Sequence, residues 1–159
     1  MATLLSEDDE VKTSIDLILL KEKLENKPGI SWISYKILLK SGDKSLLFEK
    51  LENNKGAGDY VLALTPVNEI EKLILGINTF LKSTNSKTFS FEPLEPSFEL
   101  NIERSHEGYS INFWIDSGNV DSMHYTWDGF GIRLFTTEKK ISKFVNDLQK
   151  EIEGLKEKM

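Results

Sequence analysis

The stretch that decides the fold is Phe98-Glu99-Leu100-Asn101-Ile102-Glu103, followed by Tyr109-Ser110-Ile111-Asn112-Phe113-Trp114-Ile115-Asp116. In both segments every second residue is apolar, and apart from Trp114 the residues between are polar. Successive side chains of a strand point to opposite faces, so each segment predicts a strand with one buried and one solvent-facing side. The intervening His106-Glu107-Gly108 predicts a turn. This pattern is typical of an antiparallel sheet covered on one face.

The same alternation extends along the chain in both directions. It predicts strands over 30–40, 45–51, 59–64, 89–91, 123–127 and 130–134, with turns at Ser41-Gly42-Asp43 and Asp128-Gly129. Residues 13–24 fit a strand or a helix, and the loop signal Asn26-Lys27-Pro28-Gly29 favours the strand. The acidic residues 1–12 predict a flexible N-terminal segment.

Two segments have helical spacing instead. Thr65 can cap a helix that begins at Pro66 and carries the apolar stripe Ile70, Leu73, Ile74, Ile77 and Leu81. Thr136 or Thr137 can cap a second helix, with the stripe Ile141, Phe144, Val145, Leu148, Ile152 and Leu155. The sequence therefore predicts an α+β fold, mainly antiparallel sheet, with helices at about 66–82 and 137–155 packed on its apolar face. We expect one domain over 13–155 and a frayed tail over 156–159.

Composition excludes several kinds of chemistry. The chain has 159 residues and no cysteine, so it cannot form disulfides, thiolate metal sites or a cysteine nucleophile. Its two histidines leave little material for histidine-based catalysis or metal binding. A net charge of −6 disfavours nucleic-acid binding through a positive field. No catalytic motif stands out, and we expect no enzyme activity, metal or cofactor. The start lacks signal-peptide features and no segment approaches the roughly 20 apolar residues of a membrane span, so we expect a cytoplasmic protein without membrane contact.

Charge is unevenly distributed along the chain. Residues 92–128 hold eight acidic residues against Arg104 alone, a net charge of −7 that exceeds the −6 of the whole chain. Several of these acids fall on the polar face of the predicted strands. Such a face can attract a basic partner, or it can serve only solubility and protection of sheet edges. The sequence leaves both interpretations open.

Three aromatic residues depart from the alternation: Trp32, Trp114 and Phe135 fall on the faces opposite to their apolar neighbours. Tryptophan is enriched at the centres of protein interfaces, so these residues can be contact points for a partner. They can equally be covered by another part of the chain and form a second, smaller core.

The order of segments resembles that of the WapI-type immunity proteins, small bacterial proteins that protect a cell from a toxin. The resemblance rests on an early strand at 13–20, the segment Trp32-Ile33-Ser34-Tyr35-Lys36-Ile37, the helix from Pro66, the stretch 89–100 with its Glu95-Pro96 step, and a final helix opened by Thr136-Thr137-Glu138. It implies a protein that binds and occludes a cognate toxin, and it supplies no catalytic residues.

The resemblance and the charge pattern converge on one hypothesis. An acidic sheet would complement the basic groove of a nuclease toxin, and aromatic side chains would slow dissociation. The predicted partner contacts are Glu99, Glu103, Trp114, Asp116 and Asp121. A second hypothesis is a non-catalytic scaffold domain that self-associates through the same sheet, so the chain can be a monomer or a homodimer. A hydrolase that uses a carboxylate pair is a third.

Overall fold

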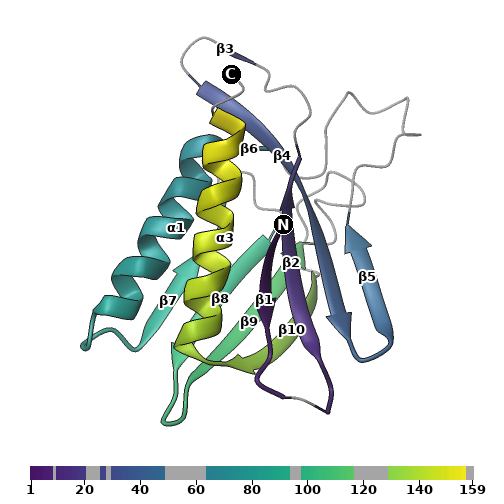
Figure 1. Ribbon diagram of the computed structural model, residues 1–159, viewed down its shortest axis with the longest axis vertical. Helices are drawn as coiled ribbons and strands as arrows, with labels where there is room; N and C mark the ends of the chain where they lie inside the picture. The colour runs from purple at the N-terminus through teal and green to yellow at the C-terminus, as the bar shows by residue number, and fades with distance from the viewer. Residues whose placement is uncertain are drawn as a thin grey trace.

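The computed structural model describes residues 1–8, 10–20, 26–27, 30–48, 64–93, 98–116 and 129–156. This part of the chain forms two antiparallel sheets and the helices α1 (Val67–Lys82) and α3 (Glu138–Lys156) (Figure 1). The predicted α+β class is therefore confirmed. Where the sequence predicted one sheet, the structure contains two.

The first sheet has four strands in the order β10-β9-β8-β7. Their bounds are β7 (Thr88–Phe91), β8 (Phe98–Arg104), β9 (Tyr109–Asp116) and β10 (Gly129–Thr136). The predicted alternation is confirmed in β8 and β9, because the apolar set is buried. This set comprises Phe98, Leu100, Ile102, Tyr109, Ile111, Phe113 and Ile115.

The second sheet is organised around a long strand, β4 (Ile30–Ser41). One half of β4 pairs with β2 (Thr13–Leu19) on one side and β5 (Lys44–Phe48) on the other, and β1 (Ala2–Leu5) pairs with β2. The other half pairs with β3 (Asn26–Lys27) and β6 (Leu64–Pro66). The predicted β4–β5 hairpin is confirmed, and the strand predicted over 13–24 is confirmed as far as Leu19; residues 21–24 lie outside the described part of the chain. Gly42 adopts a φ of 61° in that hairpin turn, where glycine is favoured.

The core lies between two layers. In Figure 1, α1, α3 and the strands β1 and β2 lie in front of the four-stranded sheet, and one buried apolar cluster joins all of them. The ring of Tyr35 meets the ring of Phe98 edge-on, with centroids 5.8 Å apart, and so connects the two sheets directly. The other face of the four-stranded sheet therefore points away from the helices.

The prediction of a flexible N-terminal segment over 1–12 is wrong for its first residues. Ala2 and Leu4 are buried within strand β1, and beyond this strand the Glu7 N–H donates to the Phe135 carbonyl at 2.7 Å. The Thr136 hydroxyl also donates to the Leu5 carbonyl at 2.6 Å. The acidic run of residues 7–10 dominated the prediction and hid a four-residue strand that buries two side chains.

Boundaries shift elsewhere. Pro66 ends β6, so α1 begins one residue later than predicted, and Lys156 belongs to α3 rather than to a frayed tail. Thr137 caps α3, since its carbonyl accepts from Lys140 and Ile141 N–H at 3.1 Å each. Gly129 is the first residue of β10, opposite Asp116, and not part of a turn. The predicted strands at 59–63 and 123–127 lie outside the described residues, as do residues 157–159.

Candidate functional site

The candidate site is the face of the four-stranded sheet that points away from the helices, called here the outer face. Its residues alternate with the buried set and come from all four strands. They are Thr88, Ser90, Glu99, Asn101, Glu103, Ser110, Asn112, Trp114, Asp116, Gly129, Gly131, Arg133 and Phe135. Glu99 and Glu103 are exposed, and the two aromatic side chains keep 46% (Trp114) and 39% (Phe135) of their surface exposed. The outer face therefore presents acidic and aromatic groups together.

At its centre, three residues lie side by side across three strands. Register places Glu99 of β8 opposite Trp114 of β9, and Trp114 opposite Gly131 of β10. A Cβ atom on Gly131 would lie 2.2 Å from Cε3 of Trp114, so the indole ring rests against the backbone of β10. Only glycine allows so close an approach. The ring thus has one side on the neighbouring strand while the side chain as a whole remains half exposed.

The charges of the outer face are partly organised by hydrogen bonds. Asn101 donates from Nδ2 to Oε1 of Glu99 at 2.7 Å, and Arg133 donates from Nε to Oδ1 of Asn112 at 2.7 Å. The net charge counted over residues 92–128 did not include Arg133, because this residue lies later in the sequence. Strand β10 places it on the outer face, opposite Asn112. Among the described residues of the outer face, three carboxylates, those of Glu99, Glu103 and Asp116, accompany this one arginine.

Arg104 lies on the opposite side of its strand and does not neutralise the outer face. Its guanidinium donates to Tyr109 Oη at 2.8 Å and to the carbonyls of Phe80 and Ser83 at 3.1 and 3.0 Å. It also lies 5.1 Å from the ring centroids of both Phe80 and Tyr109. Burial raises the pKa of Tyr109, and the hydrogen bond that Tyr109 donates to Glu138 raises it further. Arg104 thus fixes the end of α1 to the sheet.

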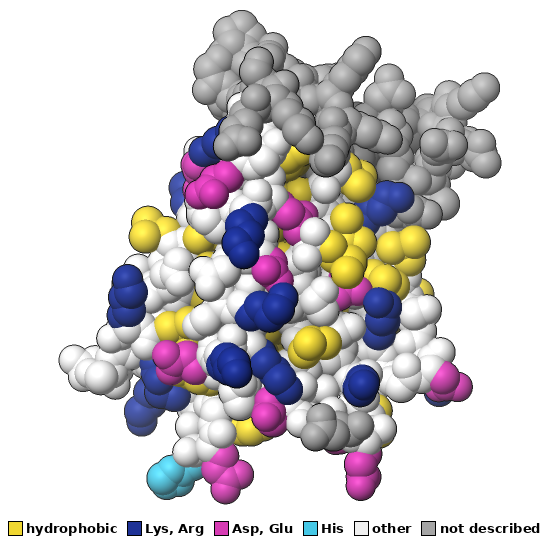
Figure 2. All heavy atoms as spheres, in the orientation of Figure 1, with side chains coloured by type: hydrophobic (Ala, Val, Ile, Leu, Met, Phe, Trp, Pro, Cys, Tyr) yellow, Lys and Arg dark blue, Asp and Glu magenta, His cyan; other side chains and the backbone are white. Residues whose placement is uncertain are grey.

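The side of the molecule in Figure 2 differs in character from the outer face. It is formed by the helices and the front of the second sheet, and lysine side chains are spread over it among acidic ones. Several of these pair with each other, as in the ion pairs Lys143–Asp147 and Lys156–Glu71. Among the described residues, an exposed tryptophan lies beside carboxylates on the outer face, whereas the helical side carries lysines interspersed with acids.

The structure brings together four of the five predicted contacts, namely Glu99, Glu103, Trp114 and Asp116. Asp121 and the side chain of Trp32 lie outside what the structure describes. Sequence reasoning placed Asn101 and Asn112 correctly on this face, but it did not join to them the β10 residues Gly131 and Arg133. The alternation of residues 130–134 contained the signal for the last two, since it placed Gly131 and Arg133 opposite to Ile132.

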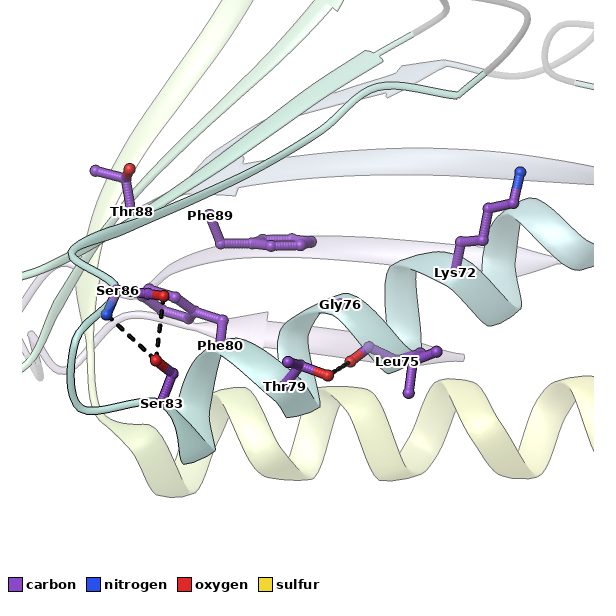
Figure 3. Close-up of a pocket in the computed structure, with 9 residues that line it drawn as sticks. All are labelled: Lys72, Leu75, Gly76, Thr79, Phe80, Ser83, Ser86, Thr88 and Phe89. Carbon is purple, nitrogen blue, oxygen red and sulfur yellow. Dashed lines mark hydrogen bonds between the residues drawn. The ribbon is translucent and has the colours of Figure 1, made fainter.

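A shallow groove of about 450 Å³ lies between α1 and β7 (Figure 3), and Thr88 at the edge of the outer face is one of its lining residues. Phe89 and Leu75 supply apolar walls, and Lys72 is its one titratable lining group. Lys72 is already paired with Glu69 at 2.6 Å. The groove therefore offers no pair of groups for acid–base chemistry.

The described residues also lack two other kinds of feature. They contain no group of three or more His, Cys, Asp or Glu side chains that could hold a metal ion. Neither described helix is long and apolar enough to cross a membrane.

Comparison of the chain with protein-family models, curated proteins and solved structures gives no match.

Proposed function

We propose that this protein is a cytoplasmic immunity protein that binds a bacterial toxin through its outer face and neutralises it by covering the toxin's active surface. The observation that carries the proposal is the central row of Glu99, Trp114 and Gly131, with further carboxylates beside it. The proposal assigns no catalytic residue.

The two kinds of side chain would act at different stages of binding. The carboxylates of Glu99, Glu103 and Asp116 would attract a basic surface. A patch of one charge sign raises the association rate with a partner of the opposite sign. The half-exposed Trp114 and Phe135 would be buried on docking and slow dissociation. A toxin that cleaves nucleic acid has a basic substrate groove of the required sign.

Self-association through the same face is the alternative, and the exposed aromatic rings of Trp114 and Phe135 are the observation that favours it. In a two-fold dimer the same face lies on both sides of the interface, so two surfaces, each with three carboxylates and one arginine among its described residues, would meet. Like charges facing each other disfavour an interface. A basic partner is therefore the better match. A stable dimer in equilibrium sedimentation that dissociates on Trp114→Ala would favour the alternative instead.

The test uses growth of the native host. The gene is deleted in a strain with an intact neighbouring toxin gene, and the strain is then complemented with variants of the protein. Wild type should restore growth, whereas the charge reversal Glu99→Lys/Glu103→Lys/Asp116→Lys should not, despite normal folding by circular dichroism.

The matched control reverses three exposed acids outside the outer face, Glu10, Asp43 and Glu153, and so changes the net charge equally. It should restore growth like wild type. The proposal is wrong if deletion has no toxin-dependent effect on growth. Equal rescue by both triple variants would remove the outer face as the binding surface.

A further inference from the structure

We infer that the centre of the outer face is a subsite for an arginine side chain of the bound protein, with the guanidinium stacked on the Trp114 ring and bonded to Glu99. This inference rests on the proposed function, because it assigns the chemistry of the partner at that surface.

The first support is the orientation of the indole ring. Because the missing side chain of Gly131 lets the ring lie against β10, the ring is held as a platform instead of projecting freely into solvent. A platform fixed before binding loses little side-chain entropy when a second planar group stacks on it. The 46% exposure of Trp114 leaves the surface needed for such stacking.

The second support is the position of the carboxylates around the ring. Glu99 lies directly across the strand pair from Trp114, where side chains of neighbouring strands come within contact distance. Asn101 donates to Oε1 of Glu99, and no donor in the described part of the chain reaches Oε2. Asp116 lies two residues beyond Trp114 on the same face of β9. The carboxylate of Glu99 is thus the negative group directly beside the platform, and Asp116 shares its face.

Arginine fits this arrangement better than lysine does. The guanidinium group is planar, is weakly hydrated and presents parallel N–H donors to a carboxylate. It can therefore stack on the indole and donate hydrogen bonds to Glu99 at the same time. An ammonium group cannot stack, and it loses more hydration when it leaves water. The protein's own Arg133 does not fill the subsite, because its guanidinium is bonded to Asn112 in the next row.

The experiment measures the preference directly and does not require the toxin. The full chain, labelled with ¹⁵N, is titrated at low salt with a short glycine peptide that carries arginines, and separately with the same peptide carrying lysines. The indole N–H signal of Trp114, assigned with Trp114→Leu, reports binding. We expect the arginine peptide to bind about two- to fivefold more tightly than the lysine peptide, the range that an exposed cation–π contact gives.

Two variants separate the components. Glu99→Gln should weaken both peptides and leave the Trp114 signal responsive, and Glu153→Gln on the helical side should change nothing. Equal affinities for the two peptides would overturn the arginine subsite, as would shifts confined to residues other than Trp114 and its neighbours. That result would leave the host growth test standing, and failure of the growth test would not alter a measured arginine preference.

Discussion

Replacement of Arg104 by alanine tests the assignment of this residue to the core side of the sheet. The side chain joins three parts of the fold: it bonds two carbonyls at the end of α1, the hydroxyl of Tyr109 in β9, and through that hydroxyl the Glu138 carboxylate at the start of α3. If this placement is correct, Arg104→Ala should be among the most destabilising polar substitutions in the chain.

The magnitude follows from the contacts that are lost. A partly buried cation at a helix C-terminus stabilises by up to about 2 kcal/mol. Two cation–π contacts, here with Phe80 and Tyr109, contribute roughly 0.5–1 kcal/mol each. Together we expect a loss of about 3 kcal/mol, a large effect for a single substitution. Arg104→Lys keeps the charge without the forked geometry and should lose about half as much.

Urea unfolding followed by circular dichroism gives the measurement, with equal m-values required for the comparison. Arg133→Ala is the matched control, because this arginine lies in the same sheet but is exposed and makes one hydrogen bond to Asn112. It should lose less than about 1 kcal/mol. A loss below about 1 kcal/mol for Arg104→Ala, or one equal to that of the control, would refute the reasoning.

Three further predictions concern stability. Leu4→Ala should lower the free energy of unfolding by about 3 kcal/mol in a urea titration, because Leu4 is buried, whereas a flexible N-terminus would give no change. Lys40→Met should lower the free energy of unfolding by about 3 kcal/mol in the same assay, because it removes the counter-charge of Asp16, which is 1% exposed and lies 2.9 Å from Lys40 Nζ. An unchanged urea midpoint would contradict this. The raised pKa of Tyr109 means that its ionisation favours the unfolded chain. Wild-type stability should therefore fall above the ordinary tyrosine pKa of about 10 more steeply than that of Tyr109→Phe, as thermal melts across alkaline pH would reveal; equal slopes would exclude it.

The elements that could be predicted are those whose local pattern agrees with their burial. In β8, β9, α1 and α3 the apolar spacing alone identifies the buried side, so type and boundaries agree with prediction to within a residue or two. Strand β1 failed this test because its burial comes from distant partners. Its neighbours are β2, the end of β10 and helix α3. The four residues of β1 are too few to indicate these long-range contacts from sequence alone.

The division into two sheets was also beyond the sequence pattern. Strands on either side of α1 show the same alternation, and the alternation records only that each strand has a covered face, not which element covers it. Long-range contacts, such as that between Tyr35 and Phe98, decide this arrangement.

For the outer face, the sequence predicted which residues of β8 and β9 share one side of the sheet, but it misjudged the charge of that side. Period-two spacing was enough to place Glu99, Glu103, Trp114 and Asp116 on one face, because register preserves the side on which each residue lies. The charge count failed because it followed the chain instead of the sheet. It included Arg104, which points to the core side, and omitted Arg133, which β10 brings to the outer face.

The glycine at position 131 connects the stability of the sheet with its proposed role. Glycine in a strand interior weakens the strand by roughly 0.5–1 kcal/mol relative to alanine. If the outer face served only solubility, glycine at position 131 would cost stability without any benefit. A tryptophan over a glycine of the neighbouring strand recovers part of that loss by covering the exposed backbone. A smaller ring or an aliphatic side chain would cover it too, yet position 114 carries the largest aromatic side chain, directly opposite the carboxylate-bearing Glu99. For this combination we therefore favour the proposed partner surface, which needs a flat ring held in place before binding, over repair of a weak strand.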